Sequence, residues 1–331
     1  MSSLRVGVVG VGHLGKQHAR LYSAMGVLAA VSDSMPERGA EIAGLYKVPL
    51  VADYRELFGK VDAVSIAVHT EHHNAIAREF LERGIPALVE KPLARTIEQA
   101  EDLCRIARAR KVALQVGHVE RFNPAVTAVL DVIKKPRFIE VHRLSPFRFR
   151  SQDIDVVMDL MIHDLDIVLH LTGSPLARVD AVGMSLLFGK EDMANARLEF
   201  EDGCVANLTA SRISEKTMRK TRIFSEDCYV TVDTLAKEAW IYRTTPQLAS
   251  ALGKLPKDRD LSIADLASIP KEFYSIQEVK LPDEEPLARE LQSFVDCVTG
   301  GLEPVVPGEH GVRAMRAADR ILTEMRAHRW K

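Results

Sequence analysis

The feature that most constrains this chain is a glycine-rich turn between two short apolar runs near the N-terminus. The first run is Val6–Val9, the turn is Gly10–Gly15 (GVGHLG), and the second run covers residues 27–31. A helical pattern continues from the turn to about Met25. Two buried strands joined through one helix are typical of a βαβ unit in a parallel sheet.

The three glycines of the turn suit the close approach of a dinucleotide. Gly10 permits the tight turn, Gly12 lets the backbone approach a pyrophosphate, and Gly15 lets the helix pack on the strand. Free amides at the helix N-terminus would hold the pyrophosphate, so we include the neighbouring His13 and Leu14 as cofactor contacts. An ordinary strand-to-helix turn is the alternative interpretation.

Asp33 ends the second apolar run and favours NAD over NADP as the cofactor. It follows Gly12 by about the 20 residues expected for an acid that binds a ribose 2′-hydroxyl. A carboxylate at this position repels the 2′-phosphate of NADP. Ser34 and Arg38 keep NADP as an alternative, and we count Arg38 among the cofactor residues.

The composition excludes several classes of protein. The chain has 331 residues and a net charge of −2, so it has no strong basic field for nucleic acid. The cysteines at 104, 204, 228 and 297 form no CxxC pair, which argues against a zinc knuckle or a disulfide framework. No apolar segment reaches the ~18 residues of a membrane span. We therefore expect a cytoplasmic protein without a membrane partner.

The order of apolar runs predicts two domains. Strand-like and helical runs alternate to residue 118, which predicts a mostly parallel sheet with helices on both faces over residues 1–118. We assign residues 119–307 to an α+β domain with an open antiparallel sheet, because its strand-like runs follow one another without helices. We expect a helix at 286–299, an irregular insert at 244–270, and a last helix, 308–331, that packs back on the first domain. The strand-like runs are residues 176–187, 194–200, 204–211, 219–225, 228–233 and 238–242.

An open sheet needs cover for its outer face, and a second subunit is a common solution. We therefore expect a homo-oligomer, a dimer or a tetramer, that is formed through the sheet of the second domain.

Polar residues follow the predicted strands of the first domain at the edge where ligands bind. Glu90, Lys91 and Pro92 come directly after one buried strand, and His69 follows another. Proline biases the preceding lysine toward extended geometry, so its ammonium can be aimed. A lysine there can hold a substrate hydroxyl or move a proton. The alternative is a surface lysine at the start of a loop.

A second group of polar residues opens a helix in the other domain. Asp159 and His163 lie at i and i+4, on one face if the helix covers both residues. Neutral histidine can take a hydroxyl proton near neutral pH, and Asp159 can orient the imidazole. The alternative role for Asp159 is to cap the helix. A metal site with Asp166 is disfavoured because Asp166 projects to another face, so we expect no metal.

These three motifs, in this order, resemble the glucose-fructose oxidoreductase / inositol dehydrogenase / MocA family over nearly the whole chain. The resemblance implies a Rossmann domain, an open antiparallel sheet through which subunits associate, and a catalytic trio of Lys91, Asp159 and His163. It also implies that Glu90, Lys91 and His73 lie at the cofactor. The family usually has proline where this chain has His69.

Two longer segments, residues 117–124 (GHVERFNP) and 162–176 (IHDLDIVLHLTGSPL), are most similar to one branch of that family. Its members oxidise the 3-hydroxyl of UDP-N-acetylglucosamine to a ketone, which an aminotransferase converts to an amine for lipid A. The resemblance thus implies a nucleotide-sugar substrate and NAD as the cofactor. Another UDP-sugar or a free polyol such as inositol is the alternative substrate, and an inactive NAD-sensing regulator is the alternative function.

One local feature agrees with a nucleotide sugar. Arginine and phenylalanine alternate at residues 147–150, on the approach to Asp159. Arginine binds phosphate through two hydrogen bonds, and phenylalanine stacks on a base. We expect substrate contacts from four residues, Arg121, Asn123, Arg148 and Arg150. A basic surface loop is the alternative interpretation.

Overall fold

The computed structural model describes residues 4–147, 154–187, 189–245 and 269–328, with residues 247, 248, 250, 254 and 262 between them. Contacts within the chain divide it into two compact units. The first contains Met1–Phe122 and Glu284–Asp319, and the second contains Asn123–Asp283 and Arg320–Lys331. Each unit is described by itself.

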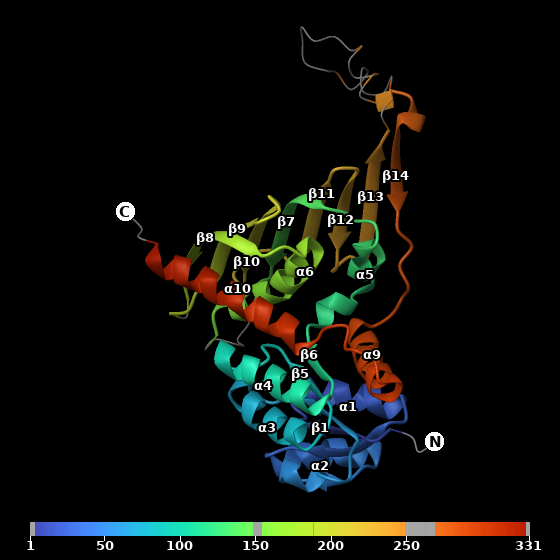
Figure 1. Ribbon diagram of the computed structural model, residues 1–331, viewed down its shortest axis with the longest axis vertical. Coiled ribbons are helices and arrows are strands. Elements are labelled where there is room, and N and C mark those ends of the chain that lie inside the picture. Colours follow the sequence, from blue (N-terminus) through green and yellow to red (C-terminus); the bar gives the residue numbers. More distant parts are fainter. Residues whose placement is uncertain are drawn as a thin grey trace. The chain divides into compact units, whose positions relative to one another are not determined.

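The first unit contains a sheet of six parallel strands, as the alternating pattern predicts (Figure 1). The strand order β3-β2-β1-β4-β5-β6 places β1 and β4 side by side at the centre. The crevice of such a sheet lies where the strand order reverses, at the carboxyl ends of these two strands. The bounds are β1 (Val6–Val9), β2 (Leu28–Ser32), β3 (Leu50–Val51), β4 (Ala63–Ile66), β5 (Ala87–Glu90) and β6 (Leu114–Gly117).

Helices cover both faces of this sheet (Figure 1). Apolar residues of α1, α2 and α9 share one buried cluster with β1, and α3 packs beside α4. Residues Tyr54–Leu57 form a short 3-10 turn, η1. The bounds are α1 (Gly15–Ala24), α2 (Pro36–Tyr46), η1 (Tyr54–Leu57), α3 (Thr70–Glu82), α4 (Ile97–Arg110), η2 (Val119–Phe122) and α9 (Pro286–Gly300).

Helix α9 belongs to the first unit, whereas the sequence placed it in the second domain. Its apolar face carries Leu291 and Phe294, which are fully buried in the cluster that contains Tyr22 of α1. The Gln115 side chain on β6 also donates a hydrogen bond to the carbonyl oxygen of Glu290 (3.1 Å). The expected boundary at residue 118 separates this helix from the sheet that it covers, because periodicity does not reveal which partner an amphipathic helix selects.

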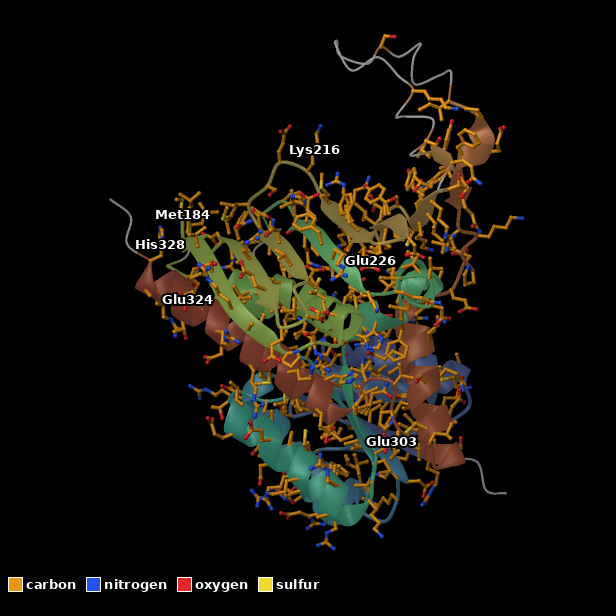
Figure 2. All side chains as sticks on the ribbon, turned by 45° about the horizontal axis from the view of Figure 1, so that its top comes forward. Met184, Lys216, Glu226, Glu303, Glu324 and His328 are labelled. Carbon is orange, nitrogen blue, oxygen red and sulfur yellow. The ribbon has the colours of Figure 1, made fainter. Side chains whose placement is uncertain are left out.

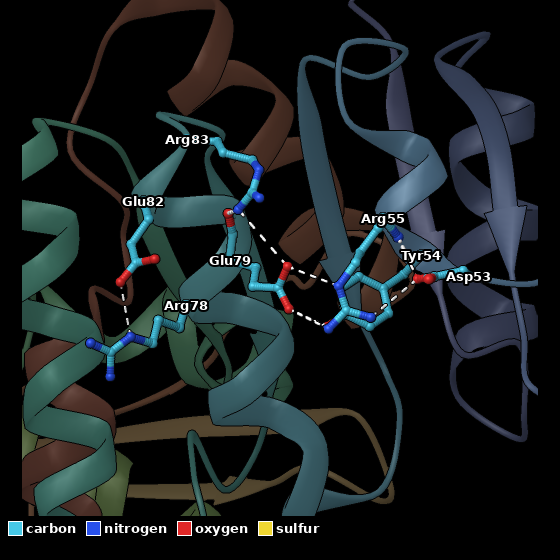
Figure 3. A network of polar contacts seen from close by, with 7 residues as sticks. All are labelled: Asp53, Tyr54, Arg55, Arg78, Glu79, Glu82 and Arg83. Atoms are coloured by element: carbon cyan, nitrogen blue, oxygen red, sulfur yellow. Dashed lines mark hydrogen bonds and ion pairs between the residues drawn. The ribbon is translucent and has the colours of Figure 1, made fainter.

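A surface network in the first unit joins η1 to α3 (Figure 3). Arg55 donates to both oxygens of Glu79, at 2.6 and 3.1 Å, and Tyr54 donates to the same carboxylate at 2.7 Å. The Arg55 side chain is 52% exposed, so solvent screens the pair and it contributes little to folding. We therefore assign this network to the surface and give it no part in the candidate site.

The second unit contains an eight-stranded sheet that is antiparallel except where β7 pairs with β10 (Figure 1). This confirms the predicted open, mostly antiparallel sheet. Strand β14 lies in a stretch for which the sequence predicted no strand. The order is β14-β13-β12-β11-β7-β10-β9-β8, with β7 (Pro136–Leu144), β8 (Leu176–Met184), β9 (Met193–Phe200), β10 (Val205–Ser211), β11 (Met218–Ser225), β12 (Cys228–Asp233), β13 (Glu238–Thr244) and β14 (Tyr274–Glu278).

The described helices of this unit cover one face of the sheet. They are α5 (Pro124–Leu130), the π-helical turn η3 (Val157–Met161) and α6 (Ile162–Thr172), while η4 (Lys271–Phe273) precedes β14. Helix α10 (Gly308–Ala327) enters the unit at Arg320, which donates to the carbonyl oxygens of Leu176 (2.6 Å) and Ala177 (2.9 Å). Gly183 of β8 leaves room for the Met325 side chain, and Figure 2 labels the neighbouring residues Met184 and Glu324.

The other face of the eight-stranded sheet carries a row of aromatic side chains. Phe138, Phe224, Tyr229 and Tyr242 lie opposite one another on successive strands, with ring centroids 4.5–5.9 Å apart. Phe224 is 40% exposed, and Ile276 extends the row on β14 at 56% exposure. We call these five residues the aromatic row.

None of the described helices combines the length and the apolar character that crossing a bilayer requires.

Candidate active site

The glycine turn of the first unit has the geometry that its sequence predicts. Gly10 has a φ of +82°, and a Cβ on it would lie 2.6 Å from Cγ1 of Val68. A Cβ on Gly15 would collide with the carbonyl oxygen of Gly10, so helix α1 begins in direct contact with the turn. Around Gly12, the Cβ position meets only the Arg38 guanidinium, whose nearest atom is 3.8 Å away. Gly12 therefore leaves the space that a pyrophosphate needs.

Asp33 lies at the end of β2 and is 4% exposed. Its carboxylate accepts the backbone amides of Val11 and Met35, each at 2.8 Å, and the Nε (2.9 Å) and Nη2 (2.7 Å) of Arg38. Burial alone would raise the pKa of Asp33, but the hydrogen bonds from Arg38 and the two amides hold it below its ordinary value. The four donors occupy the roughly four acceptor positions of a carboxylate. A ribose hydroxyl can bind there only if Arg38 moves.

These features fit an NAD molecule. The open turn at Gly12, the start of α1 beside the exposed His13 and Leu14, and the ionised Asp33 supply a pyrophosphate site and a ribose acceptor. Arg38 is 41% exposed at its side chain, so it has room to leave Asp33.

His73 joins the two loops that follow β4 and β5. Its Nδ1 lies 2.9 Å from the carbonyl oxygen of Pro92, and its Nε2 lies 3.1 Å from that of Val68. The residue is only 1% exposed, and burial lowers its pKa although both carbonyls favour the charged ring. His73 thus fixes the loops of the crevice through backbone oxygens, while His69, at the N-cap of α3, is exposed.

Glu90, at the carboxyl end of β5, is buried in a hydrogen-bonded chain. Its Oε1 lies 3.0 Å from Nε2 of His18, and Nδ1 of His18 lies 2.7 Å from the hydroxyl of Ser65. The second oxygen, Oε2, accepts the backbone amide of Lys91 at 3.3 Å. Burial by itself would raise the pKa of Glu90, but the hydrogen bond and charge of His18, with the charge of Lys91, hold it below its ordinary value. Glu90 is therefore ionised, and it lies directly before the candidate catalytic lysine in the chain.

Gly117 on β6 makes room for this carboxylate. A Cβ at Gly117 would lie 2.8 Å from Oε2 of Glu90 and 2.9 Å from its Cδ. Lys91, directly after Glu90, is half-buried and precedes Pro92 through a cis peptide bond. The loop that carries Lys91 is thus packed against β6.

Asp159 and His163 lie on consecutive helical turns of the second unit. Asp159 belongs to the π-helical turn η3 and His163 to the first turn of α6, and both are half-buried. The helix therefore covers both residues, as their placement on one face requires. Asp159 does not cap it, because Asp159 lies inside η3 and the N-cap is Val156; before the cap, Asp155 accepts the amide of Met158 at 2.8 Å. Single π-helical turns occur often at functional sites.

Two buried ion pairs hold the surroundings of this helix. Asp164, beside His163, accepts Nε and Nη2 of Arg143 from β7, both at 2.8 Å, and neither side chain is more than 7% exposed. Arg212 donates to Asp192 (2.9 Å) and to the carbonyl oxygen of Ile154 (2.7 Å), just before the helix begins. Asp164 therefore has a structural role, and Arg143 is not available to a phosphate.

The expected substrate residues fall in different places. Arg121 lies in η2 of the first unit and is 3% exposed. Asn123 is 7% exposed, and its side-chain oxygen accepts the amide of Ala125 (3.0 Å) as the cap of α5. Arg148 and Arg150 lie outside the described residues.

Sequence reasoning missed the residues that support the candidate site from within. His18, Ser65 and Arg143 are buried and polar, and none belongs to a recognised motif. A histidine among apolar residues on α1 signals a buried partner, but the chain alone does not identify that partner. Among the described residues, no group of three or more histidine, cysteine, aspartate or glutamate side chains is arranged to hold a metal.

Two family models match the chain. The oxidoreductase family with an NAD-binding Rossmann fold (GFO_IDH_MocA) matches residues 4–118, and the GFO/IDH/MocA C-terminal domain matches residues 135–230.

Relatives match over the full length as well. UDP-N-acetylglucosamine 3-dehydrogenase of Acidithiobacillus ferrooxidans is 37% identical over 328 residues, which cover 99% of each chain. The solved structure of that enzyme has a TM-score of 0.88 at 36% identity, with 99% of both chains covered. Inositol 2-dehydrogenase of Rhizobium meliloti is 25% identical over 337 residues, covering 96% of this chain and 95% of that one.

Proposed function

The chain belongs to the GFO/IDH/MocA oxidoreductase family, and on that premise we propose that it oxidises a secondary hydroxyl of a nucleotide-activated sugar with NAD. The substrate that we propose is UDP-N-acetylglucosamine, with its 3-hydroxyl converted to a ketone for amino-sugar and lipid A synthesis. The observation that carries the proposal is the 37% identity, over 99% of the chain, to an enzyme named for that reaction.

Lys91, Asp159 and His163 are the residues that we propose as catalytic. Oxidation of an alcohol requires a group that removes the hydroxyl proton, and nicotinamide supplies the hydride acceptor when it is bound. In this proposal Lys91 and His163 handle the proton of the substrate hydroxyl, and Asp159 orients the imidazole.

Gly10, Gly12, Gly15 and Asp33 are the residues that we propose to hold NAD, with the exposed His13 and Leu14 beside the pyrophosphate. Arg38, His69 and Glu90 complete the cofactor side. For the substrate, we propose Arg148 and Arg150 as ligands of the diphosphate, because arginine binds phosphate through paired hydrogen bonds. Asn123 has a smaller part, since its oxygen already caps α5.

The test is a panel of UDP-sugars and free polyols, each followed by NADH absorbance at matched concentrations. We expect turnover of UDP-N-acetylglucosamine, and a fall in kcat of about 10²–10⁴ for Lys91→Ala and for His163→Ala. Thermal unfolding of each variant serves as the control for folding. Oxidation of inositol alone would contradict the proposal and favour a polyol dehydrogenase, the activity for which the Rhizobium relative is named.

We also propose that two copies of the chain associate through the aromatic row. An exposed set of stacked rings, with Ile276 at 56% exposure, is the kind of apolar surface that a second copy would cover. Phe224→Arg places a charge in the middle of the row and should reduce the mass measured by light scattering to that of one chain. Arg178→Glu, on an exposed position of β8, is the matched control. An unchanged mass for Phe224→Arg would exclude this surface.

The cytoplasm is the compartment that we propose, since a reducing environment suits its cysteines. All four cysteines are free and buried. Burial raises the pKa of Cys104 to about 12 and that of Cys204 to about 11, so neither forms a reactive thiolate near neutral pH.

A further inference from the structure

The buried chain Ser65–His18–Glu90 lies entirely within the first unit and ends at Glu90, which accepts the backbone amide of Lys91, the residue proposed as catalytic. It connects three elements that are distant in sequence: β4, helix α1 and the end of β5. His18 is 0% exposed, and the Glu90 side chain is 8% exposed. Burying an acid and a histidine costs folding free energy unless both are hydrogen-bonded. The presence of this pair next to Lys91 therefore requires an explanation.

We propose that His18 and Glu90 are positioning residues for Lys91: Glu90 fixes the lysine backbone and supplies a negative charge that sets the proton affinity of its ammonium. This inference rests on the proposed function of Lys91.

The geometry gives each atom of the pair a separate task. Oε2 of Glu90 accepts the amide of Lys91, and Oε1 is held by His18, so the carboxylate cannot rotate without losing a hydrogen bond. Gly117 lets the carboxylate lie against β6, where a Cβ would displace it. The loop of Lys91 is held a second time by His73, through the carbonyl oxygen of Pro92. The position of the lysine backbone is thus fixed from two sides.

The serine hydroxyl completes the chain at its far end. A hydroxyl both donates and accepts, so Ser65 can pair with Nδ1 of His18 while Nε2 faces the Glu90 carboxylate. Both ring nitrogens of His18 thus have partners, and Oε1 of Glu90 is held in place. The negative charge of Glu90, next to Lys91 in the chain, favours the ammonium form of the lysine.

Other charged groups near the pair come from three further elements, and they must be controlled in a test. His73 on α3 and Lys91 both act on Glu90, and Glu290 on α9 acts on Tyr22, whose ring lies edge-on to that of His18 with 6.5 Å between centroids. Tyr22 is buried in the same cluster; its hydroxyl interacts with Ser65 and senses the charge of Glu90, but it makes no hydrogen bond to Glu90 among the described contacts. Tyr22→Phe therefore controls for disturbance of the packing and of Ser65, while Glu90 keeps its charge.

The first experiment measures the titration of Lys91 in the protein without substrate. Competitive acetylation at a series of pH values, followed by mass spectrometry of the peptide, gives the midpoint directly. Glu90→Gln keeps the shape and removes the charge, so we expect the Lys91 midpoint to move about one pH unit lower. Tyr22→Phe should leave the midpoint where it is in the wild type. An unchanged midpoint in a folded Glu90→Gln protein overturns the electrostatic part of the proposal.

The second experiment uses two amides that resemble different edges of the imidazole. In His18→Gln, the side-chain NH₂ lies near the position of Nε2 and can still donate to Glu90. In His18→Asn, the shorter side chain reaches only toward Ser65. We expect His18→Asn to lower kcat about tenfold with the KM for NAD within twofold of the wild type, and His18→Gln to recover most of that loss. Equal kcat values for the two variants and the wild type overturn the role of His18.

The two experiments separate this inference from the function on which it rests. If UDP-N-acetylglucosamine is not oxidised, the kcat comparison uses whichever substrate of the panel turns over, and the acetylation midpoint needs no substrate. A shifted midpoint together with no turnover of UDP-sugars would reject the substrate and retain the positioning pair. Turnover of UDP-sugars with an unshifted midpoint would retain the substrate and reject the positioning pair.

Discussion

The two units hold their candidate site residues by different physical means. In the first unit, much of the positioning is done by the backbone: a left-handed Gly10, the contact of Gly15 with the turn, and two amides on Asp33. In the second unit, charged side chains do it. Arg143 and Asp164 are 21 residues apart, and Arg212 and Asp192 are 20 apart, yet each pair is buried and hydrogen-bonded.

This difference determines which substitutions each site tolerates. A site that is positioned by backbone geometry is disrupted when an added side chain collides with it. Substitutions that add atoms are therefore the most sensitive test of such a site. A site built from buried ion pairs fails when one partner is removed, because the other charge remains without compensation in a medium of low dielectric. The predictions below test this comparison, beginning with the largest expected effect.

Removal of one member of the buried pair should give the largest loss of stability. Arg143→Met leaves the Asp164 carboxylate buried, and we expect the free energy of unfolding to fall by about 3–5 kcal/mol in urea titrations. The double variant Arg143→Met/Asp164→Leu removes both charges and should recover much of the loss. Arg178→Met breaks a pair exposed by 65% and 48% and should cost about 0–1 kcal/mol. Equal costs for the two single variants would show that burial is not decisive.

The steric prediction concerns the glycine turn. Gly15→Ala puts a methyl group onto the carbonyl oxygen of Gly10, so we expect a loss of about 1–3 kcal/mol in stability and weaker NAD binding by fluorescence titration. Gly44→Ala is the matched control, because nothing lies within 4 Å of its Cβ position in the last turn of α2. That variant should gain up to about 1 kcal/mol from helix propensity. Similar losses at both positions would contradict the steric role of Gly15.

The same contrast explains how much the sequence alone could predict. The six parallel strands and their helices follow from local periodicity, and Gly10 and Gly15 follow from a motif whose geometry is local. Strand β14 was missed because its five residues are mostly exposed and carry little pattern. The π-helical turn at Asp159 was missed because its sequence also suits an ordinary helix.

Long-range pairs were beyond the sequence for a different reason. Asp164 lies in the first turn of α6, where an acid also suits the helix dipole, yet it binds Arg143 of β7. Each side chain has several possible partners, and only the register of the sheet and the helix selects one. His18 and Glu90 are 72 residues apart and illustrate the same limit within the first unit.

Cofactor preference should depend on a single charge at the end of β2. Asp33→Asn keeps an acceptor for the ribose hydroxyl and for Arg38 but removes the repulsion of a 2′-phosphate. Two unit charges 4 Å apart interact by about 1–4 kcal/mol near a protein surface, so the ratio of kcat/KM for NAD to that for NADP should fall at least about fivefold. Asp53→Asn, at the exposed cap of η1, should leave the ratio unchanged. A constant ratio in Asp33→Asn would assign the preference to another residue.

The smallest expected effect is a pH dependence of stability from His73. Its pKa is lowered by burial, so the folded protein binds the proton less readily than the unfolded chain, whose histidine titrates near the ordinary value of 6.5. The stabilisation from the neutral ring is therefore complete above about pH 7 and is lost as the pH falls from 6.5 toward the folded pKa, by at most about 1.4 kcal/mol per pH unit.

His73→Gln can still donate to a carbonyl oxygen but does not titrate, so its unfolding free energy should fall less steeply than that of the wild type between pH 7 and about pH 5. His72→Gln, an exposed neighbour on α3, provides the control, and urea titrations at each pH supply the measurement. Parallel curves for His73→Gln and the wild type would mean that His73 titrates at the same pH in the folded and unfolded states, which would contradict a pKa lowered by burial.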